Sequence, residues 1–201
     1  MVKSGLVDDP NVSQYRLTAH LGMAVFIYSL ILWTVFDLSL NYNHAIRSRI
    51  KWMSSTLTLL IFLMILSGGL VAGTRAGIPF PTWPLMGDTF IPPQIYSMNP
   101  SWLSAFEDMA TIQFNHRMFA YLLTIFIVIF AIVLLRSNVP RFLKNGTTVL
   151  LFVLSLQVVL GISTLLFYIP IPVAAAHQVG AIALLSVSLF ITHSCLSRKQ
   201  I

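Results

Sequence analysis

The chain has 201 residues, of which 57% are hydrophobic and only 9% are charged. About a quarter of the residues of a soluble domain are charged, so this composition excludes an ordinary soluble domain and indicates an integral membrane protein. The net charge of +6 comes from basic residues scattered over short connections and not from one face, which argues against nucleic-acid binding. The single cysteine, Cys195, excludes an intramolecular disulfide.

Five apolar segments are long enough to cross a bilayer as helices, which rise about 1.5 Å per residue through a hydrocarbon core about 30 Å thick. Residues 1–16 are polar and lack the order of a secretory signal, so we expect an outer polar segment there. The predicted transmembrane helices are 17–36, 52–73, 114–135, 147–168 and 173–195. The expected fold is an all-α polytopic membrane protein whose last four helices, within residues 52–195, form a four-helix bundle.

Residues 74–112 interrupt this pattern with six prolines and several aromatic residues. A connection of this length is usually functional or disordered, and its aromatic content argues against disorder. Trp and Tyr favour the membrane interface. We therefore expect an ordered outer cap whose aromatic residues are interface anchors, a position that also fits a lid.

The basic residues divide unequally between the two sides of the predicted membrane. Eight fall on one side, namely Arg47, Arg49, Lys51, Arg136, Arg141, Lys144, Arg198 and Lys199. Four fall on the other side, namely Lys3, Arg16, Arg75 and Arg117. The positive-inside rule predicts that the first side is cytoplasmic or matrix and that the cap faces outward.

Three histidines, His20, His116 and His177, lie close to the outer ends of their predicted helices. With about 1.5 Å per residue they fall at a similar depth, so we expect one layer of imidazoles under the cap. His44 and His193 lie toward the opposite side and do not join this layer.

The histidine layer favours heme iron over a bare metal ion. A structural zinc site typically has four ligands that include Cys, and no Cys or acidic residue lies in the helices at this depth. A heme needs one or two axial ligands with apolar walls, and His116 and His177 on facing helices could supply both. Arg117, with Arg75 from the cap, could pair with carboxylates such as heme propionates.

Each of these residues also has a plainer interpretation, which the sequence leaves open. An interfacial histidine is often a solvated helix-end residue, and Arg117 could be a snorkelling anchor. Small residues in membrane helices commonly serve packing, and a mid-helix amide commonly bonds a neighbouring helix. These readings apply to Gly68, Gly69, Gly73 and Gln157.

A weak internal repeat links the first and last predicted helices. Residues 18–22 (TAHLG) open one helix much as residues 175–180 (AAHQVG) open the other, both on the outer side. Such a repeat is expected if 17–36 is the last helix of one bundle and 173–195 is the last helix of a second bundle.

The chain resembles the heme A synthase family over nearly its whole length and in order. The Thr82–Gly87 segment is more similar to proteobacterial members than to animal ones. The matching segments are Val12–Leu17, Ala19–Gly22, Ser67–Gly73, Thr82–Gly87, Gln113–Arg117, Leu160–Leu165 and Ala176–Gln178.

The resemblance implies an eight-helix protein of two four-helix halves, which oxidises a methyl group of heme o to a formyl group and also carries heme b. By this resemblance His116 and His177 match the heme b iron ligands of the carboxy-terminal half, with Arg117 beside them. His20 matches a catalytic axial ligand of the substrate heme, and 17–36 matches the last helix of the amino-terminal half.

The family's first three helices have no counterpart here, so we expect the chain to be a fragment that needs the missing helices for catalysis. The resemblance implies the bacterial inner membrane, or the mitochondrial inner membrane in a eukaryote. Implied partners are lipid, heme O synthase, cytochrome oxidase assembly factors and a second copy, with no nucleic acid. Two alternatives stay open: a non-catalytic heme b-binding or electron-transfer module, and a cofactor-free membrane assembly protein.

Overall fold

The computed structural model describes residues 13–40, 45–93 and 95–196, which are largely helical and contain no β-strand. Five of their helices are long and apolar enough to cross a membrane. They are α1 (Gln14–Ser39), α2 (Ser48–Thr74), α4 (Met109–Leu135), α5 (Arg141–Leu166) and α6 (Ile171–Leu196). The predicted all-α fold with five transmembrane helices is confirmed.

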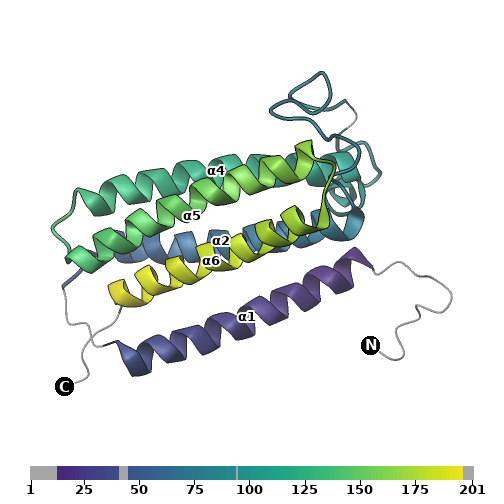
Figure 1. The fold of residues 1–201 in the computed structure, drawn as a ribbon. Helices are drawn as coiled ribbons and strands as arrows, with labels where there is room; N and C mark the ends of the chain where they lie inside the picture. The colour runs from purple at the N-terminus through teal and green to yellow at the C-terminus, as the bar shows by residue number, and fades with distance from the viewer. Residues whose placement is uncertain (1–12, 41–44, 94, 197–201) are drawn as a thin grey trace.

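The helices α2, α4, α5 and α6 form a four-helix bundle, the arrangement that the sequence predicted for the last four helices. Going round the bundle, the order is α2, α4, α5, α6, so that α4 and α6 lie diagonally opposite each other. The first helix, α1, lies outside the bundle and packs along α2 and α6 (Figure 1). Side chains on α4 and α6 can therefore meet only through the bundle interior.

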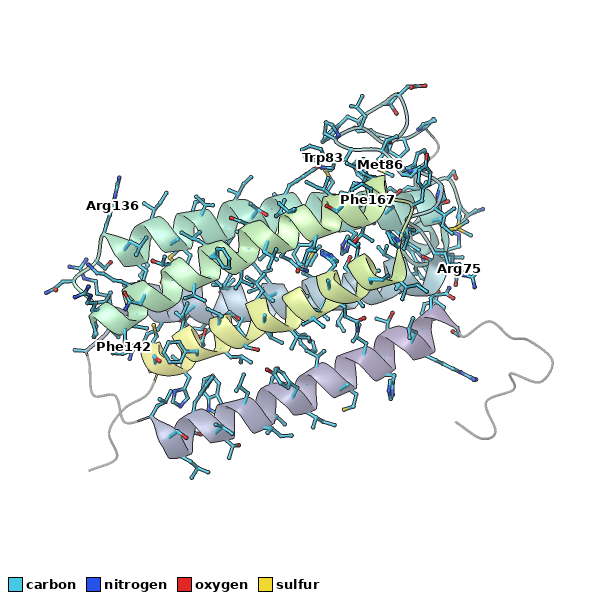
Figure 2. All side chains as sticks on the ribbon, viewed as in Figure 1. Arg75, Trp83, Met86, Arg136, Phe142 and Phe167 are labelled. Carbon is cyan, nitrogen blue, oxygen red and sulfur yellow. The ribbon has the colours of Figure 1, made fainter. Side chains whose placement is uncertain are left out.

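The two ends of the bundle differ in chemistry. The cap end carries residues 75–108 and the turn 167–170, and the basic end carries residues 45–47 and 136–140. Figure 2 shows Arg75, Trp83, Met86 and Phe167 at the cap end, opposite Arg136 and Phe142. The described cations that the orientation argument grouped together do share the basic end: Arg47, Arg49, Lys51, Arg136, Arg141 and Lys144. Lys3, His44, Arg198, Lys199 and residues 1–12 of the predicted polar segment lie outside the described residues.

All five transmembrane helices begin earlier than the sequence predicted, and α4 and α5 differ most. The helix α4 begins at Met109 and not at residue 114, because the Asp108 carboxylate caps it by accepting a hydrogen bond from the Thr111 backbone N at 2.7 Å. The helix α5 begins at Arg141 and not at residue 147. Consequently Lys144, expected in a connection, projects from the first turn of a helix.

Small residues of α2 allow α1 to pack closely against it. A Cβ atom at Gly73 would lie 2.7 Å from the Cα atom of Gln14, and one at Gly69 would lie 3.1 Å from the Thr18 hydroxyl. Side chains at these positions would force the two backbones apart. The contacts support the helix-packing interpretation of both glycines.

Polar contacts fasten α1 at both of its ends. At the cap end, Glu107 of the short helix α3 (Ser104–Glu107) accepts a hydrogen bond from Gln14 Nε2 at 2.9 Å and another from the Tyr15 hydroxyl. At the basic end, the buried His193 Nε2 lies 2.8 Å from the Asp37 carboxylate. His193 is therefore far from the cap end, as the sequence predicted.

The apolar core is concentrated toward the basic end of the bundle. Side chains there are completely buried, including Leu57, Phe130, Leu143, Leu150 and Ile191. On α5 and α6, by contrast, no residue between Leu154 and Leu184 is fully buried. The fully buried residues of these two helices therefore lie in their basic-end halves.

Candidate functional site

His116 lies two turns inside α4, and its ring is directed at α2. Its Nδ1 atom is 3.0 Å from the Ser67 hydroxyl, and a Cβ atom at Gly68 would lie 3.6 Å from its Cε1 atom. The hydroxyl can accept a hydrogen bond from Nδ1–H, and in that tautomer Nε2 carries a free lone pair. The half-buried ring can then act as a ligand through Nε2.

His177 lies in the second turn of α6, and its ring rests on α5 at Gly161. A Cβ atom at Gly161 would lie only 2.9 Å from Cε1 of the ring, so the absence of a side chain makes this position possible. The His177 backbone carbonyl accepts a hydrogen bond from Gln157 Nε2 at 2.9 Å. The Nδ1 atom is buried without a hydrogen bond.

These two imidazoles both lie toward the cap end of the bundle. They sit on diagonally opposite helices, which face each other only across the bundle interior. Within the described residues, no group of three or more His, Cys, Asp or Glu side chains could hold a metal ion. A four-ligand zinc site of protein side chains is therefore absent from this part of the chain, while a pair of imidazole donors is present.

His20 is placed differently from the other two predicted site histidines. It lies on α1, outside the four-helix bundle, and it is exposed. The predicted layer of three imidazoles is thus reduced, inside the bundle, to His116 and His177. The side of a helix that faces the interior depends on its rotation and neighbours, which the depth argument did not include.

Arg117 is buried and holds the cap. Its two terminal nitrogens donate hydrogen bonds to the carbonyls of Phe80 at 3.0 Å, Thr82 at 2.8 Å and Leu85 at 3.1 Å. Gln113, one turn earlier on α4, donates to the same Phe80 carbonyl at 3.0 Å. The guanidinium therefore does not extend out of the protein toward solvent. It binds three carbonyls of the cap and holds this loop against the end of the bundle.

Aromatic side chains add to this attachment of the cap to α4. The Trp83 indole N–H donates to the Tyr121 hydroxyl at 3.1 Å, and the Tyr96 hydroxyl donates to the Asn115 side-chain carbonyl at 3.0 Å. Arg75 ends α2 with a left-handed backbone, φ 57°, and is exposed at the same end. The cap is thus folded onto the helix that carries His116.

Sequence reasoning missed the residues that support the two histidines. Ser67 and Gly161 belong to segments that resemble a known family, but no pattern along the chain shows that they face His116 and His177. Gly180 carried no signal beyond its place after a histidine. Only the relative rotation of the helices reveals these pairings.

Comparison with known proteins gives one family model and several curated relatives. A family model described as cytochrome oxidase assembly protein matches residues 1–189. A heme A synthase of Nitrosospira multiformis is 44% identical, over 96% of this chain and 55% of the relative. Heme A synthases of Bradyrhizobium diazoefficiens and Bos taurus are each 39% identical, over 56% and 49% of their own lengths. The chain spans about half the length of these curated relatives, and no solved structure matches it.

Proposed function

Because the chain belongs to the family of cytochrome oxidase assembly proteins, and curated relatives are named heme A synthase, we propose that it acts in heme A biosynthesis. The proposed reaction is the oxidation of a heme o methyl group to a formyl group. In this proposal the bundle of α2, α4, α5 and α6 holds heme b between His116 and His177. The observation that carries it is the pair of imidazoles on diagonal helices at the cap end of the bundle.

The donor set fits a heme. Two imidazoles are the axial ligands of many heme proteins, and the rest of the cofactor needs apolar surroundings and little else. His116 has its Nδ1 atom engaged by Ser67, which leaves Nε2 available. Gly68 and Gly161 place no side chain against the two rings, and the buried, unbonded Nδ1 of His177 is a polar atom without a structural use.

A heme supplies the redox chemistry that oxidation of an unactivated methyl group requires and that no side chain provides. The chain's residues would bind and orient it. His116 and His177 would set the plane of the cofactor, and Ser67 would hold one of the rings. The cap, held by Arg117, would exclude water from the outer end of the bundle.

Arg117 also fits the proposal as a charged group. Two of its nitrogens are used on cap carbonyls, while its Nε is buried without a hydrogen bond. A guanidinium one residue from an axial ligand would attract the propionate carboxylates of heme b. The exposed Arg75 at the cap end is a second cation within the same region.

We assign His20 to the substrate heme o, as its axial iron ligand. This assignment follows from the family resemblance and from the position of His20 on α1, outside the heme b bundle. Since the imidazole is exposed, a substrate heme there needs a second protein surface to cover it. Membrane lipid, heme O synthase, oxidase assembly factors and a second copy are the proposed partners.

The second candidate is a heme b-binding electron-transfer module without catalysis. It is favoured by the contrast between a complete imidazole pair in the bundle and a single exposed His20. Such a module would bind heme b and would leave heme o unconverted. A cofactor-free assembly protein would purify without colour.

The test is the reduced-minus-oxidised visible spectrum of the detergent-purified full chain, with pyridine hemochrome analysis of the bound heme. We expect about one low-spin heme b per chain, in keeping with one bis-imidazole site. His116→Ala and His177→Ala should each abolish the low-spin signal, because one axial ligand is lost.

The matched control is His193→Gln, which changes a histidine at the far end of α6 and retains a partner for Asp37. This variant should keep the heme spectrum. A low-spin spectrum that survives both His116→Ala and His177→Ala would refute the axial assignment. Conversion of heme o in co-expressing cells then separates the enzyme from the electron-transfer module.

A further inference from the structure

The contact between α5 and α6 is built from a polar side chain and a glycine on each helix. The His177 ring of α6 lies on Gly161 of α5, and the Gln157 side chain of α5 lies on Gly180 of α6. A Cβ atom at Gly180 would overlap the Oε1 atom of Gln157. On each helix the glycine follows the polar residue by one turn, so the two pairs interlock.

One hydrogen bond crosses this contact. Gln157 Nε2 donates to the His177 backbone carbonyl at 2.9 Å. Two further atoms at the contact, Gln157 Oε1 and His177 Nδ1, are buried without a hydrogen bond. Buried polar atoms are rarely left in this way, because each costs free energy.

The two imidazoles of the pair are therefore held by different means. The His116 ring is bonded directly, through Nδ1, to the Ser67 hydroxyl at 3.0 Å. The His177 ring has no such bond, and the Gln157 amide instead holds its backbone.

We propose that Gln157 is the positioning residue for His177. Its side chain fixes the α6 backbone at His177 by donating to the His177 carbonyl, and so sets where the imidazole lies on Gly161. This inference rests on the proposed heme site, which it extends by a residue that touches neither heme nor substrate. A purely structural role, in which the amide only joins two helices, would leave the ligation of the heme unchanged.

The experiment uses the full heme-loaded chain and carbon monoxide as the probe. In the reduced protein carbon monoxide competes with an axial imidazole, so its binding rate reports how firmly that imidazole is held. Gln157→Met keeps the length of the side chain and removes the amide. We expect bound heme to be retained and carbon monoxide binding to be about fivefold faster, the factor that corresponds to one lost hydrogen bond.

Gln178→Met is the matched control, because it makes the same chemical change at an exposed residue next to His177. This control should keep the rate of the unmodified protein. The low-spin electron paramagnetic resonance signal, which depends on the relative orientation of the two imidazole planes, should shift in Gln157→Met and not in Gln178→Met.

Gly180→Ala provides a second route to the same result, since the added Cβ displaces the Gln157 amide without removing it. It serves where Gln157→Met fails to fold. An unchanged rate and resonance signal in a folded, heme-loaded Gln157 or Gly180 variant would overturn the positioning role and leave the proposed function standing. If the purified unmodified chain carries no heme, both the positioning role and the proposed function are overturned.

Discussion

Replacing Arg117 by methionine removes the guanidinium that gathers the cap and keeps a side chain of similar length. Three hydrogen bonds are lost, to the carbonyls of Phe80, Thr82 and Leu85. The aromatic contact between Trp83 and Tyr121 stays in place. The substitution therefore tests how far one buried cation stabilises the closed cap.

The expected loss of free energy depends on which hydrogen bonds each of the three carbonyls retains after the substitution. A hydrogen bond to a charged group contributes about 1.5–3 kcal/mol, so three give at most about 9 kcal/mol. The Phe80 carbonyl keeps its bond from Gln113, and the Leu85 carbonyl keeps one from the Thr82 hydroxyl at 2.9 Å. Thr82 and Leu85 are exposed and can bond water. We therefore expect a loss of about 3 kcal/mol, or roughly 100-fold in the opening equilibrium of the cap.

Hydrogen exchange measured by mass spectrometry over peptides that cover residues 79–89 is the assay. Exchange there should be about 100-fold faster in Arg117→Met, while peptides of α5 should be unchanged. Arg117→Lys is the matched variant, because it keeps the charge but lacks the planar guanidinium group. Exchange in its cap should be slower than in Arg117→Met and faster than in the unmodified chain. Equal protection of the cap in Arg117→Met and the unmodified chain would show that aromatic contacts, and not the guanidinium, close it.

Two predictions concern α1. Asp37→Ala leaves the buried His193 without its partner, so we expect the free energy of unfolding to fall by about 1–3 kcal/mol, measured by chemical denaturation in detergent, with Asp37→Asn nearer the unmodified value. Gly73→Ala places a Cβ atom 2.7 Å from the Gln14 Cα atom and should push α1 from α2, which raises protease sensitivity at the start of α1. In Gly68→Ala the added Cβ atom would lie 3.6 Å from His116, so protease sensitivity should stay unchanged. Equal protease sensitivity in Gly73→Ala and Gly68→Ala would contradict the role of Gly73 in the packing of α1 on α2.

The sequence was sufficient for the number of transmembrane helices and for the depth of His116 and His177 along them, for a physical reason. An apolar run long enough to cross a bilayer leaves the backbone no alternative to a helix, so five spans could be counted. The positions of His116 and His177 along their helices then set a common depth. The start of α4 was misplaced because the polar turn capped by Asp108 precedes the apolar run.

Roles that depend on helix rotation could not be read in the same way. His20 and His177 occupy similar positions in similar segments, yet one is exposed on α1 and the other rests on Gly161. Arg117 looked like a cofactor ligand or an anchor because its partners, the carbonyls of residues 80–85, lie more than thirty residues earlier in the chain. A contact with a backbone carbonyl cannot be predicted from the pattern of side chains along the sequence, because every residue has such a carbonyl.

One turn of α4 carries two adjacent side chains that contact different parts of the protein. Consecutive residues on a helix point about 100° apart, so His116 is turned toward α2 while Arg117 is turned toward the cap. Both side chains project from the same helix, so a change in the tilt of α4 would move the His116 imidazole and the Arg117 contacts with the cap together.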